Sequence, residues 1–391
     1  IVFMDIREPN SAPGTRDLRI DFFRGIALYM IIVDHIPNDP LNRFTYSRLG
    51  LSDAAERFVF LSGISCGIVF YRVLLRQGIG GLVKAIGKRA FQIYAYYLLA
   101  SIVTIAIIAA SRDIWTIPAN QQAFIDLRED PVSAILSAIR LTSPPDLPGI
   151  LVLYLELTVV AIPAFLLFSA NGYRNALIGS GLVWAFSQSY PNVLPHLADH
   201  SYFNPLAWQF IFCIGMFIGT SYTTGSKPLE GLQSKKWIAI AWSIVILELG
   251  YRLALVIFAK LHIDADWLTL SDPTLRHMKE NLSAFRLVHF LSVALLVATY
   301  IKRDNPVLSW QGADAIIKSG RSSLQVFCMG AIFTVLLNLI VAVERPMILE
   351  RLVLDCAAIF LIGLTATLLM KARLERRQAR AEQLSPRPRT V

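Results

Sequence analysis

The chain has 391 residues, of which 55% are hydrophobic and only 17% are charged, and its formal net charge is +9. A soluble domain carries about 25% charged residues, and it could not cover this much apolar side chain with polar surface. The composition therefore excludes a soluble globular protein and a disordered chain. It predicts a protein that crosses a membrane several times.

Apolar segments close to the length of about 20 residues that a spanning helix needs recur about ten times along the chain. They cover residues 20–36, 54–75, 86–110, 149–168, 174–189, 206–222, 237–259, 284–301, 322–343 and 349–370. These segments lack the alternation of period two that is typical of membrane β-strands. We therefore expect an all-α bundle of about ten transmembrane helices within residues 20–370.

The distribution of Lys and Arg sets the expected orientation of the bundle. If the N-terminus is cytoplasmic, the loops on that side and the C-terminal segment KARLERRQARAEQLSPRPRTV carry most of the basic residues, as the positive-inside rule requires. The sequence thus predicts a cytoplasmic tail over residues 1–19 and a basic cytoplasmic tail over residues 371–391, near anionic lipid headgroups. This asymmetry explains the positive net charge without a nucleic-acid partner.

The first apolar segment, IDFFRGIALYMIIVDHI, contains ionisable residues that lipid disfavours and that mark a function by default. Arg24 and His35 are eleven residues apart, so on a helix they lie within roughly 20° of one face and about 16 Å apart along the axis. Asp21 shares that face, whereas Asp34 is about 100° away from His35. His35 is expected near the outer end, where an imidazole can accept and return a proton near neutral pH. The alternative is an interfacial histidine that only faces headgroups.

The second apolar segment begins LGLSDAAERFVFLSGISCG. Asp53 can cap this helix, with Glu56 as its capping-box partner. The alternative is that one of these carboxylates reaches His35 across a short outer loop and fixes its tautomer. Ser62 follows on a face of small residues.

Two Gly-x3-Gly spacings occur in the apolar segments, Gly63 with Gly67 and Gly215 with Gly219. Small residues at this spacing let two helices approach closely in a membrane. We expect a packing role for both.

Five further ionisable residues lie within apolar segments, namely Glu156, Glu248, Arg252, Arg286 and His289. Glu248 and Arg252 have the favourable i,i+4 order and can simply neutralise one another. Arg286 and His289 share a helix face, and either can contact an anionic group of a substrate.

One histidine pair, His196 and His200, has a spacing that would suit a metal ion on a helix. It lies in a Pro-bounded stretch and has no evident third ligand, so we expect no metal site. The sequence also lacks a P-loop, a dinucleotide fingerprint and a G-x-S-x-G motif.

Several of these stretches resemble one family. RDLRIDFFRGIALYMIIVDHI and SDAAERFVFLSG closely resemble the OpgC family of osmoregulated periplasmic glucan succinyltransferases, within the acyltransferase-3-like membrane superfamily. FNPLAWQFIFCIGM, FRLVHFLSVA and GRSSLQVFCMG are also similar to that family, so the resemblance covers nearly the whole membrane region. The Arg-x10-His signature of the superfamily corresponds to Arg24 and His35. The fourth segment departs from the family pattern at PDLPGILVLY, which contains Tyr154.

The resemblance implies a multi-pass enzyme of the bacterial inner membrane. It would move a succinyl group from cytoplasmic succinyl-CoA, without a permanently bound cofactor, to a glucosyl hydroxyl of a periplasmic glucan. His35 is then the expected general base, and Asp34, Asp53 or Glu56 orients it or carries charge.

The resemblance and the residue chemistry together also give two expected sets of binding residues. Arg24 would hold the thioester arm of CoA or an acyl carboxylate, and the full expected substrate-binding set is Arg24, Arg252, Arg286, His289, Ser62 and Tyr154. Residues that would bind the CoA phosphates, or that only follow the positive-inside rule, are Arg16, Arg19, Lys84, Lys88 and Arg89.

Two other functions stay open at this point. An acetyl group could replace the succinyl group, because no residue in the sequence is clearly identified as binding a succinyl carboxylate. A transporter of an anionic glycan or of protons could use the charges of Glu248, Arg252 and Arg286, although the sequence shows no inverted repeat of the kind that many transporters have.

Overall fold

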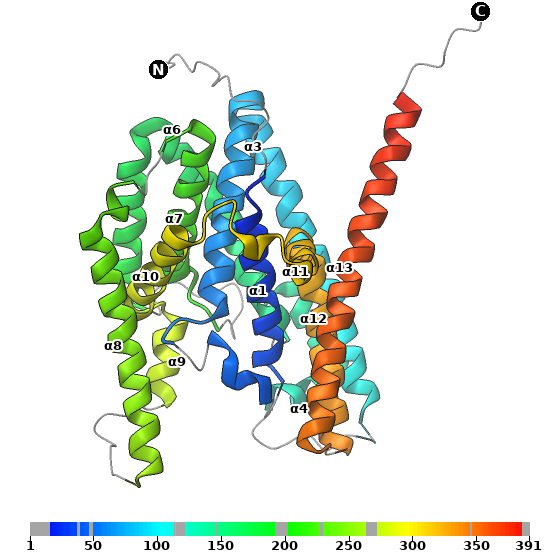
Figure 1. The fold of residues 1–391 in the computed structure, drawn as a ribbon. Coiled ribbons are helices and arrows are strands. Elements are labelled where there is room, and N and C mark those ends of the chain that lie inside the picture. The colour runs from blue at the N-terminus through cyan, green and yellow to red at the C-terminus, as the bar shows by residue number, and fades with distance from the viewer. Residues whose placement is uncertain are drawn as a thin grey trace, which may run out of the picture.

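The computed structural model describes residues 16–36, 40–46, 50–112, 114, 122–145, 147–191, 202–226, 230–262, 272–344 and 346–384. Every regular element in these ranges is helical, as the sequence predicts (Figure 1). The α-helices are α1 (Leu18–Asp34), α3 (Ala54–Ala110), α4 (Gln122–Glu129), α5 (Pro131–Arg140), α6 (Ile150–Ser189), α7 (Pro205–Thr224), α8 (Lys235–Lys260), α9 (Asp272–Glu280), α10 (Ala284–Tyr300), α11 (Gln311–Arg321), α12 (Ser323–Glu344) and α13 (Ile348–Leu384). The short 3-10 helices are η1 (Pro40–Phe44), η2 (Leu147–Gly149), η3 (Gly231–Gln233) and η4 (Pro306–Leu308).

Six helical segments in the described ranges are long and apolar enough to cross a membrane. They are Ala54–Ala110, Leu147–Phe165, Pro205–Thr224, Lys235–Phe258, Ser323–Glu344 and Ile348–Arg376. This supports a multi-pass helical membrane protein, but it does not confirm ten spans. α1 and α10 have 17 residues each, and 17 residues rise about 26 Å, which is less than the ~30 Å hydrocarbon core of a bilayer.

Two pairs of predicted spans are joined in the structure. The spans predicted at 54–75 and 86–110 both belong to α3, which turns at Gly78, where φ is +66° and ψ is −166°. Glycine adopts this left-handed φ without the steric cost that a Cβ atom brings, so the chain reverses there and the two arms of α3 run side by side (Figure 1). The spans predicted at 149–168 and 174–189 are one helical element, α6, with Pro163 inside it.

The first turn of α1 and the last turns of α13 lie at the same end of the molecule (Figure 1). We call this end, which Leu18 and Leu384 mark, the inner end. The opposite end, which Asp34 and Ala54 mark, is the outer end. The placement of both tails on the cytoplasmic side stays a prediction.

A glycine seam brings the first arm of α3 and α7 into backbone contact. A Cβ atom on Gly63 would overlap the carbonyl oxygen of Phe212, and one on Gly219 would overlap the carbonyl oxygen of Ile64. Gly67 and Gly215 make equally close backbone approaches. The packing role predicted for both Gly-x3-Gly spacings is confirmed.

α11 is an element that the apolar pattern does not predict, because it is short and amphipathic. It packs against the inner half of α1, where Gly25 touches the backbone of Ile316 and Gly320 touches the backbone of Asp21. On its other side, α11 contacts α13. α11 therefore lies between these two helices and holds the segment of α1 that precedes Arg24.

Candidate active site

His35 is the first residue after α1, and its backbone N–H closes the last turn by donating to the carbonyl oxygen of Ile32 at 3.2 Å. Its ring nitrogen Nδ1 lies 2.7 Å from the carbonyl oxygen of Ile31. Because a carbonyl oxygen can only accept a hydrogen bond, Nδ1 carries the proton of the neutral ring and Nε2 presents a lone pair. The half-buried imidazole is therefore held in the tautomer that a general base needs.

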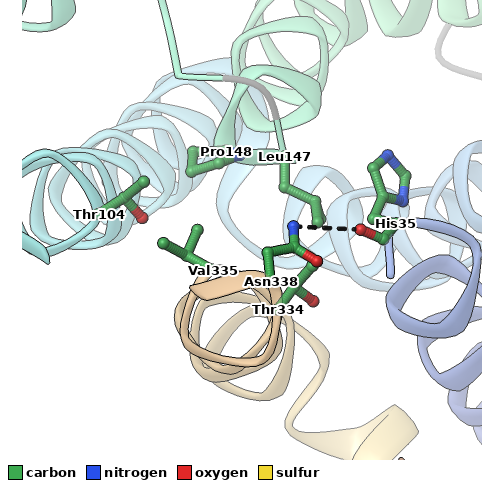
Figure 2. A pocket seen from close by; sticks show the side chains of 7 residues that line it. All are labelled: His35, Thr104, Leu147, Pro148, Thr334, Val335 and Asn338. Atoms are coloured by element: carbon green, nitrogen blue, oxygen red, sulfur yellow. Dashed lines mark hydrogen bonds between the residues drawn. The ribbon is translucent and has the colours of Figure 1, made fainter. Parts of the chain in front are cut away.

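A small hollow lies beside His35 at the outer end of α1 (Figure 2). It is small, about 10 Å³, which is room for roughly one water-sized group. Its lining residues are His35, Thr104, Leu147, Pro148, Thr334, Val335 and Asn338. Asn338 Nδ2 donates to the carbonyl oxygen of His35 at 3.4 Å, which ties α12 to the end of α1. Four helical elements thus meet at the predicted base.

Asp34 precedes His35, and its carboxylate is held by the turn that follows α1. Thr45 Oγ1 donates to Asp34 Oδ1 and lies just after η1. Consecutive helical residues point about 100° apart, so the Asp34 carboxylate and the His35 ring occupy different faces. Asp34 fixes the turn through Thr45.

Arg24 is buried in the inner half of α1, against the first arm of α3. Its Nη2 donates to the carbonyl oxygen of Leu61 at 2.6 Å and also contacts Ser65 Oγ. Its Nε has no hydrogen-bond partner among the described residues. A buried guanidinium with an unpaired N–H group can donate a hydrogen bond to an anionic or carbonyl oxygen of a ligand.

Arg89, on the second arm of α3, stands beside this group. Arg89 Nη2 lies 3.3 Å from Tyr154 Oη, and the guanidinium carbon lies 5.5 Å from the centre of the Tyr154 ring. Arg24 lies near both Tyr154 and Arg89. We call these three residues the Arg24–Arg89–Tyr154 cluster; it joins α1, α3 and α6 and carries two positive charges.

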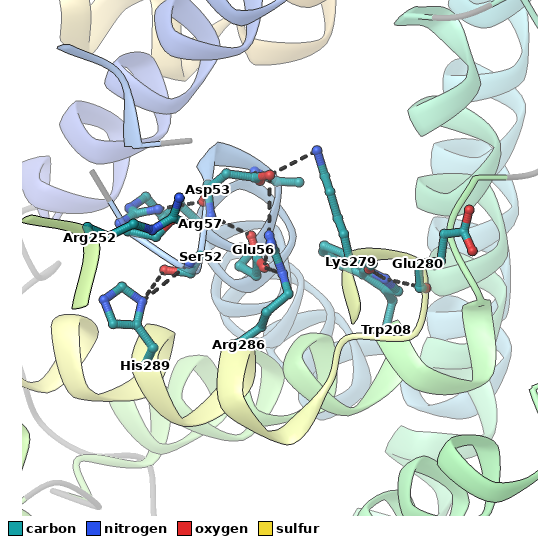
Figure 3. A network of polar contacts seen from close by, with 12 residues as sticks. Ser52, Asp53, Glu56, Arg57, Trp208, Arg252, Lys279, Glu280, Arg286 and His289 are labelled. Atoms are coloured by element: carbon teal, nitrogen blue, oxygen red, sulfur yellow. Dashed lines mark hydrogen bonds and ion pairs between the residues drawn. The ribbon is translucent and has the colours of Figure 1, made fainter. Parts of the chain in front are cut away.

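Asp53 and Glu56 form the predicted capping box at the start of α3. Asp53 accepts from the backbone N–H of Ala55 at 2.8 Å, and Glu56 accepts from the backbone N–H of Asp53 at 2.9 Å. Both carboxylates also face cations from distant elements (Figure 3). Lys279 Nζ lies 2.9 Å from Asp53 Oδ2, and Arg286 Nε lies 2.7 Å from Glu56 Oε1.

The electrostatic environment keeps Asp53 ionised. Burial alone would raise the pKa of Asp53, but the charges of Lys279 and Arg286 outweigh burial and lower it well below its usual range. Asp53, Glu56, Lys279 and Arg286 thus form a compact network of two acids and two bases.

This network bears on the two interpretations that the sequence leaves open for these carboxylates. Asp53 and Glu56 are held by the first turn of α3 and directed at Lys279 and Arg286, which favours the capping role over a role in orienting His35. Arg286, with both carboxylates as partners, is correspondingly weakened as a residue that binds a substrate anion.

His289 lies in a neighbouring group of contacts (Figure 3). Its Nδ1 is 2.9 Å from Ser52 Oγ, and its Nε2 is 3.8 Å from Glu248 Oε2. Glu248 and Arg252 form the predicted i,i+4 ion pair at 3.1 Å, and Arg252 also donates to the carbonyl oxygen of Gly50 at 3.1 Å. These contacts hold the start of α3 against α8 and α10.

The remaining predicted residues lie elsewhere. Ser62 is buried beside the glycine seam of α3. Arg16 pairs with Asp21 at 2.6 Å and Arg19 pairs with Asp17 at 2.7 Å, so both basic groups already have carboxylate partners.

Lys84 and Lys88 are exposed on the second arm of α3, a few residues after the turn at Gly78 and hence toward the inner end. Unlike Arg16 and Arg19, neither lysine forms an ion pair with a described residue.

The histidines with metal-compatible spacing, His196 and His200, lie outside the described residues. Within the described ranges, no group of three or more His, Cys, Asp or Glu side chains could hold a metal ion.

Sequence reasoning did not select three residues that the structure brings to these sites: Thr104 and Asn338 at the hollow, and Lys279 in the network. Asn338 carried a usable signal, because an amide inside the apolar segment 322–343 is costly in a membrane unless it has a polar partner. Lys279 carried none, because it falls in a loop-like stretch with many polar residues.

The described part of the chain is a helical membrane protein, and the imidazole with the oriented tautomer belongs to a residue that borders a small hollow. The chain belongs to the OpgC family: the family model described as OpgC protein matches residues 16–374. No curated protein matches the chain, and neither does any solved structure. Membership of this family indicates a glucan-modifying acyltransferase.

Proposed function

We propose that this protein is a membrane O-acyltransferase that moves a succinyl group from succinyl-CoA to a glucosyl hydroxyl of a periplasmic glucan. The observation that carries the proposal is the position of His35. Its Nδ1 is anchored on the Ile31 carbonyl, which leaves the lone pair of Nε2 available, and the residue borders the hollow. Family membership supports a glucan as the acceptor.

In the proposed reaction, Nε2 of His35 removes the proton from the acceptor hydroxyl as its oxygen attacks the thioester carbonyl. The new C–O ester bond forms, the C–S bond breaks, and the CoA thiolate takes the proton from the imidazolium. Transfer through an acyl-His35 intermediate would balance equally, with His35 Nε2 as the first nucleophile.

The geometry of α1 suggests which part of the donor meets Arg24. Arg24 and His35 are about 16 Å apart along the helix axis, whereas a succinyl chain of four carbons extends only about 4 Å. Side chains on a helix lean toward its N-terminus, so both groups lean the same way and the separation persists. When the thioester is at His35, Arg24 therefore suits the pantetheine arm or a phosphate of CoA rather than the acyl carboxylate.

The rest of the donor path follows the basic residues toward the inner end. The Arg24–Arg89–Tyr154 cluster offers two guanidinium groups inside the bundle. Lys84 and Lys88 offer exposed charges closer to the turn at Gly78. An anionic donor that enters from the inner side would meet these charges before its thioester reaches His35.

The test uses the purified full-length chain in lipid nanodiscs, with radiolabelled succinyl-CoA and an unsubstituted glucan. We expect donor-dependent formation of an alkali-labile glucan ester. His35→Gln should lower the rate by about 10²- to 10⁴-fold, the usual contribution of a general base. His277→Gln alters an exposed histidine on α9 and serves as the matched control with a wild-type rate. A wild-type rate for His35→Gln would show that this assignment is wrong.

The same preparation separates the competing functions. In proteoliposomes, glycan accumulation without any acyl donor would indicate a transporter instead of an enzyme. Competition between succinyl-CoA and acetyl-CoA at equal concentration measures the acyl preference, and we expect the succinyl ester to predominate.

A further inference from the structure

Two buried polar atoms that line the hollow beside His35 have no hydrogen-bond partner among the described residues. They are Thr104 Oγ1 and Asn338 Oδ1. Thr104 is only 2% exposed. Buried polar atoms in folded proteins nearly always find a partner, so an unpaired atom that faces a hollow points to a missing ligand or water.

Thr104 differs in this respect from other threonines of the bundle. The hydroxyls of Thr158, Thr220 and Thr334 each donate to the carbonyl oxygen four residues earlier, at 2.8 to 2.9 Å. That local bond is the usual way for a helical threonine to satisfy its hydroxyl. Thr104 does not make it, so its hydroxyl is available to a group in the hollow.

Asn338 is more selective, because its two polar atoms have different roles. Nδ2 donates to the carbonyl oxygen of His35, which fixes the amide orientation and leaves Oδ1 as a pure acceptor. A pure acceptor needs a partner that carries a hydrogen atom. The succinyl chain and the thioester carry no hydrogen-bond donor, whereas every free hydroxyl of a sugar does.

The position of the hollow agrees with this chemistry. It lies beside His35, at the outer end of α1 (Figure 2). The exposed Lys84 and Lys88 instead follow closely after the turn at Gly78, toward the inner end. Asn338 and Leu147 lie next to His35, with Thr104 and Pro148 on the far side of the hollow. The space between them, about 10 Å³, is the size of one hydroxyl group or one water molecule.

We infer that Asn338 and Thr104 form the subsite that positions the acceptor sugar, with Asn338 Oδ1 accepting from a hydroxyl adjacent to the one that reacts at His35. This inference rests on the proposed function. Both are positioning residues: they hold the alcohol in line with Nε2, while the proton transfer itself belongs to His35. The ligand class is a polyol with at least two neighbouring hydroxyls.

The experiment measures initial rates of ester formation while glucan and succinyl-CoA are varied separately. Thr104→Val keeps the side-chain size and removes the unpaired hydroxyl. Asn338→Leu removes Oδ1 together with the Nδ2 that bonds the His35 carbonyl, so the Thr104 variant is the cleaner of the two. Each should raise the KM for glucan roughly 5- to 10-fold, the worth of one hydrogen bond between neutral groups, and leave the KM for succinyl-CoA unchanged. Thr104→Ser restores the hydroxyl and should restore the KM. Thr220→Val removes a buried helical hydroxyl in α7 and should leave both constants unchanged.

The outcomes are distinct. An unchanged KM for glucan in both variants, or a rise in the KM for succinyl-CoA instead, overturns the inference and leaves the proposed function intact. Absence of ester formation by the wild-type protein overturns the proposed function and this inference with it. If Asn338→Leu lowers the melting temperature, the same two KM values are measured for Asn338→Ala, whose smaller side chain leaves a space instead of an apolar branch.

Discussion

Glu56 and Arg286 are both buried, and each is the ion-pair partner that neutralises the other's charge. Glu56 has no exposed surface, and Arg286 lies within hydrogen-bond distance of it while also contacting Asp53. Breaking a buried ion pair from one side leaves an uncompensated charge, which typically costs about 3–5 kcal/mol. We expect Arg286→Met to destabilise the protein by about that amount.

The measurement is the free energy of unfolding or the melting temperature in detergent. Glu56→Gln added to Arg286→Met removes the stranded charge and keeps a capping-box side chain, so it should recover most of the loss. Arg303→Met, which breaks an exposed pair with Asp17, should cost about 1 kcal/mol or less. If the double variant is stable but inactive, the network of Glu56 and Arg286 serves activity as well as stability. If the double variant is no more stable than Arg286→Met, the stranded charge is not the cause of the loss.

Local spacing was sufficient to predict the residue contacts that lie within one helical turn. The capping box of Asp53 and Glu56 and the pair of Glu248 and Arg252 both follow from the geometry of a single helix. The partners Lys279 and Asn338 could not be predicted, because each comes from a helix distant in the sequence. Which distant helices meet depends on the packing of the whole bundle.

The glycine seam is the clearest feature at the scale of single elements. Gly215 and Gly219 of α7 approach the backbone of α3 so closely that a methyl group has no room. Gly219→Ala should therefore force the helices apart and destabilise the protein by about 1–3 kcal/mol, the usual cost of overpacking. The melting temperature of the purified variant measures this.

Gly87→Ala is the matched control on the second arm of α3. A Cβ atom at Gly87 would meet nothing within 4 Å, and alanine favours a helix over glycine by about 0.5–1 kcal/mol. We therefore expect Gly87→Ala to be neutral or slightly stabilising. Equal losses for the two variants would argue against backbone contact at the seam.

The prediction of elements succeeded where the apolar pattern was long and failed where helices are short and amphipathic. α5, with Asp130 as its N-cap, occupies the amphipathic stretch that follows the third predicted span. α11 was missed because its apolar side faces α1 and α13 while its length is far below that of a span. A hydropathy pattern reports how apolar a segment is, and it does not report which helix covers it.

At the scale of the whole molecule, the two ends should react from opposite sides of a membrane. Phe44, at the outer end, is 73% exposed, and Arg76 is exposed beside the turn at Gly78. In a background that lacks the exposed Cys356, Phe44→Cys should react with a membrane-impermeant thiol reagent in intact spheroplasts. Arg76→Cys should react only after the membrane is opened.

This labelling separates the proposed orientation from its inverse, in which Arg76→Cys reacts first. The distribution of Lys and Arg in the sequence predicts the orientation, because it depends on charge counts over whole loops. The number of spans was less predictable, because a turn within an apolar stretch depends on one residue such as Gly78.

The place of His35, directly beyond the last residue of α1, ties the chemistry to the register of that helix. One residue inserted between Arg24 and His35 would lengthen α1 by about 1.5 Å and rotate its end by about 100°. Such an insertion hardly changes the apolar length of the segment, yet it would carry the imidazole off the hollow and away from Asn338. Exchange of one apolar side chain for another within this stretch should therefore disturb the site less than a change in the number of residues between Arg24 and His35.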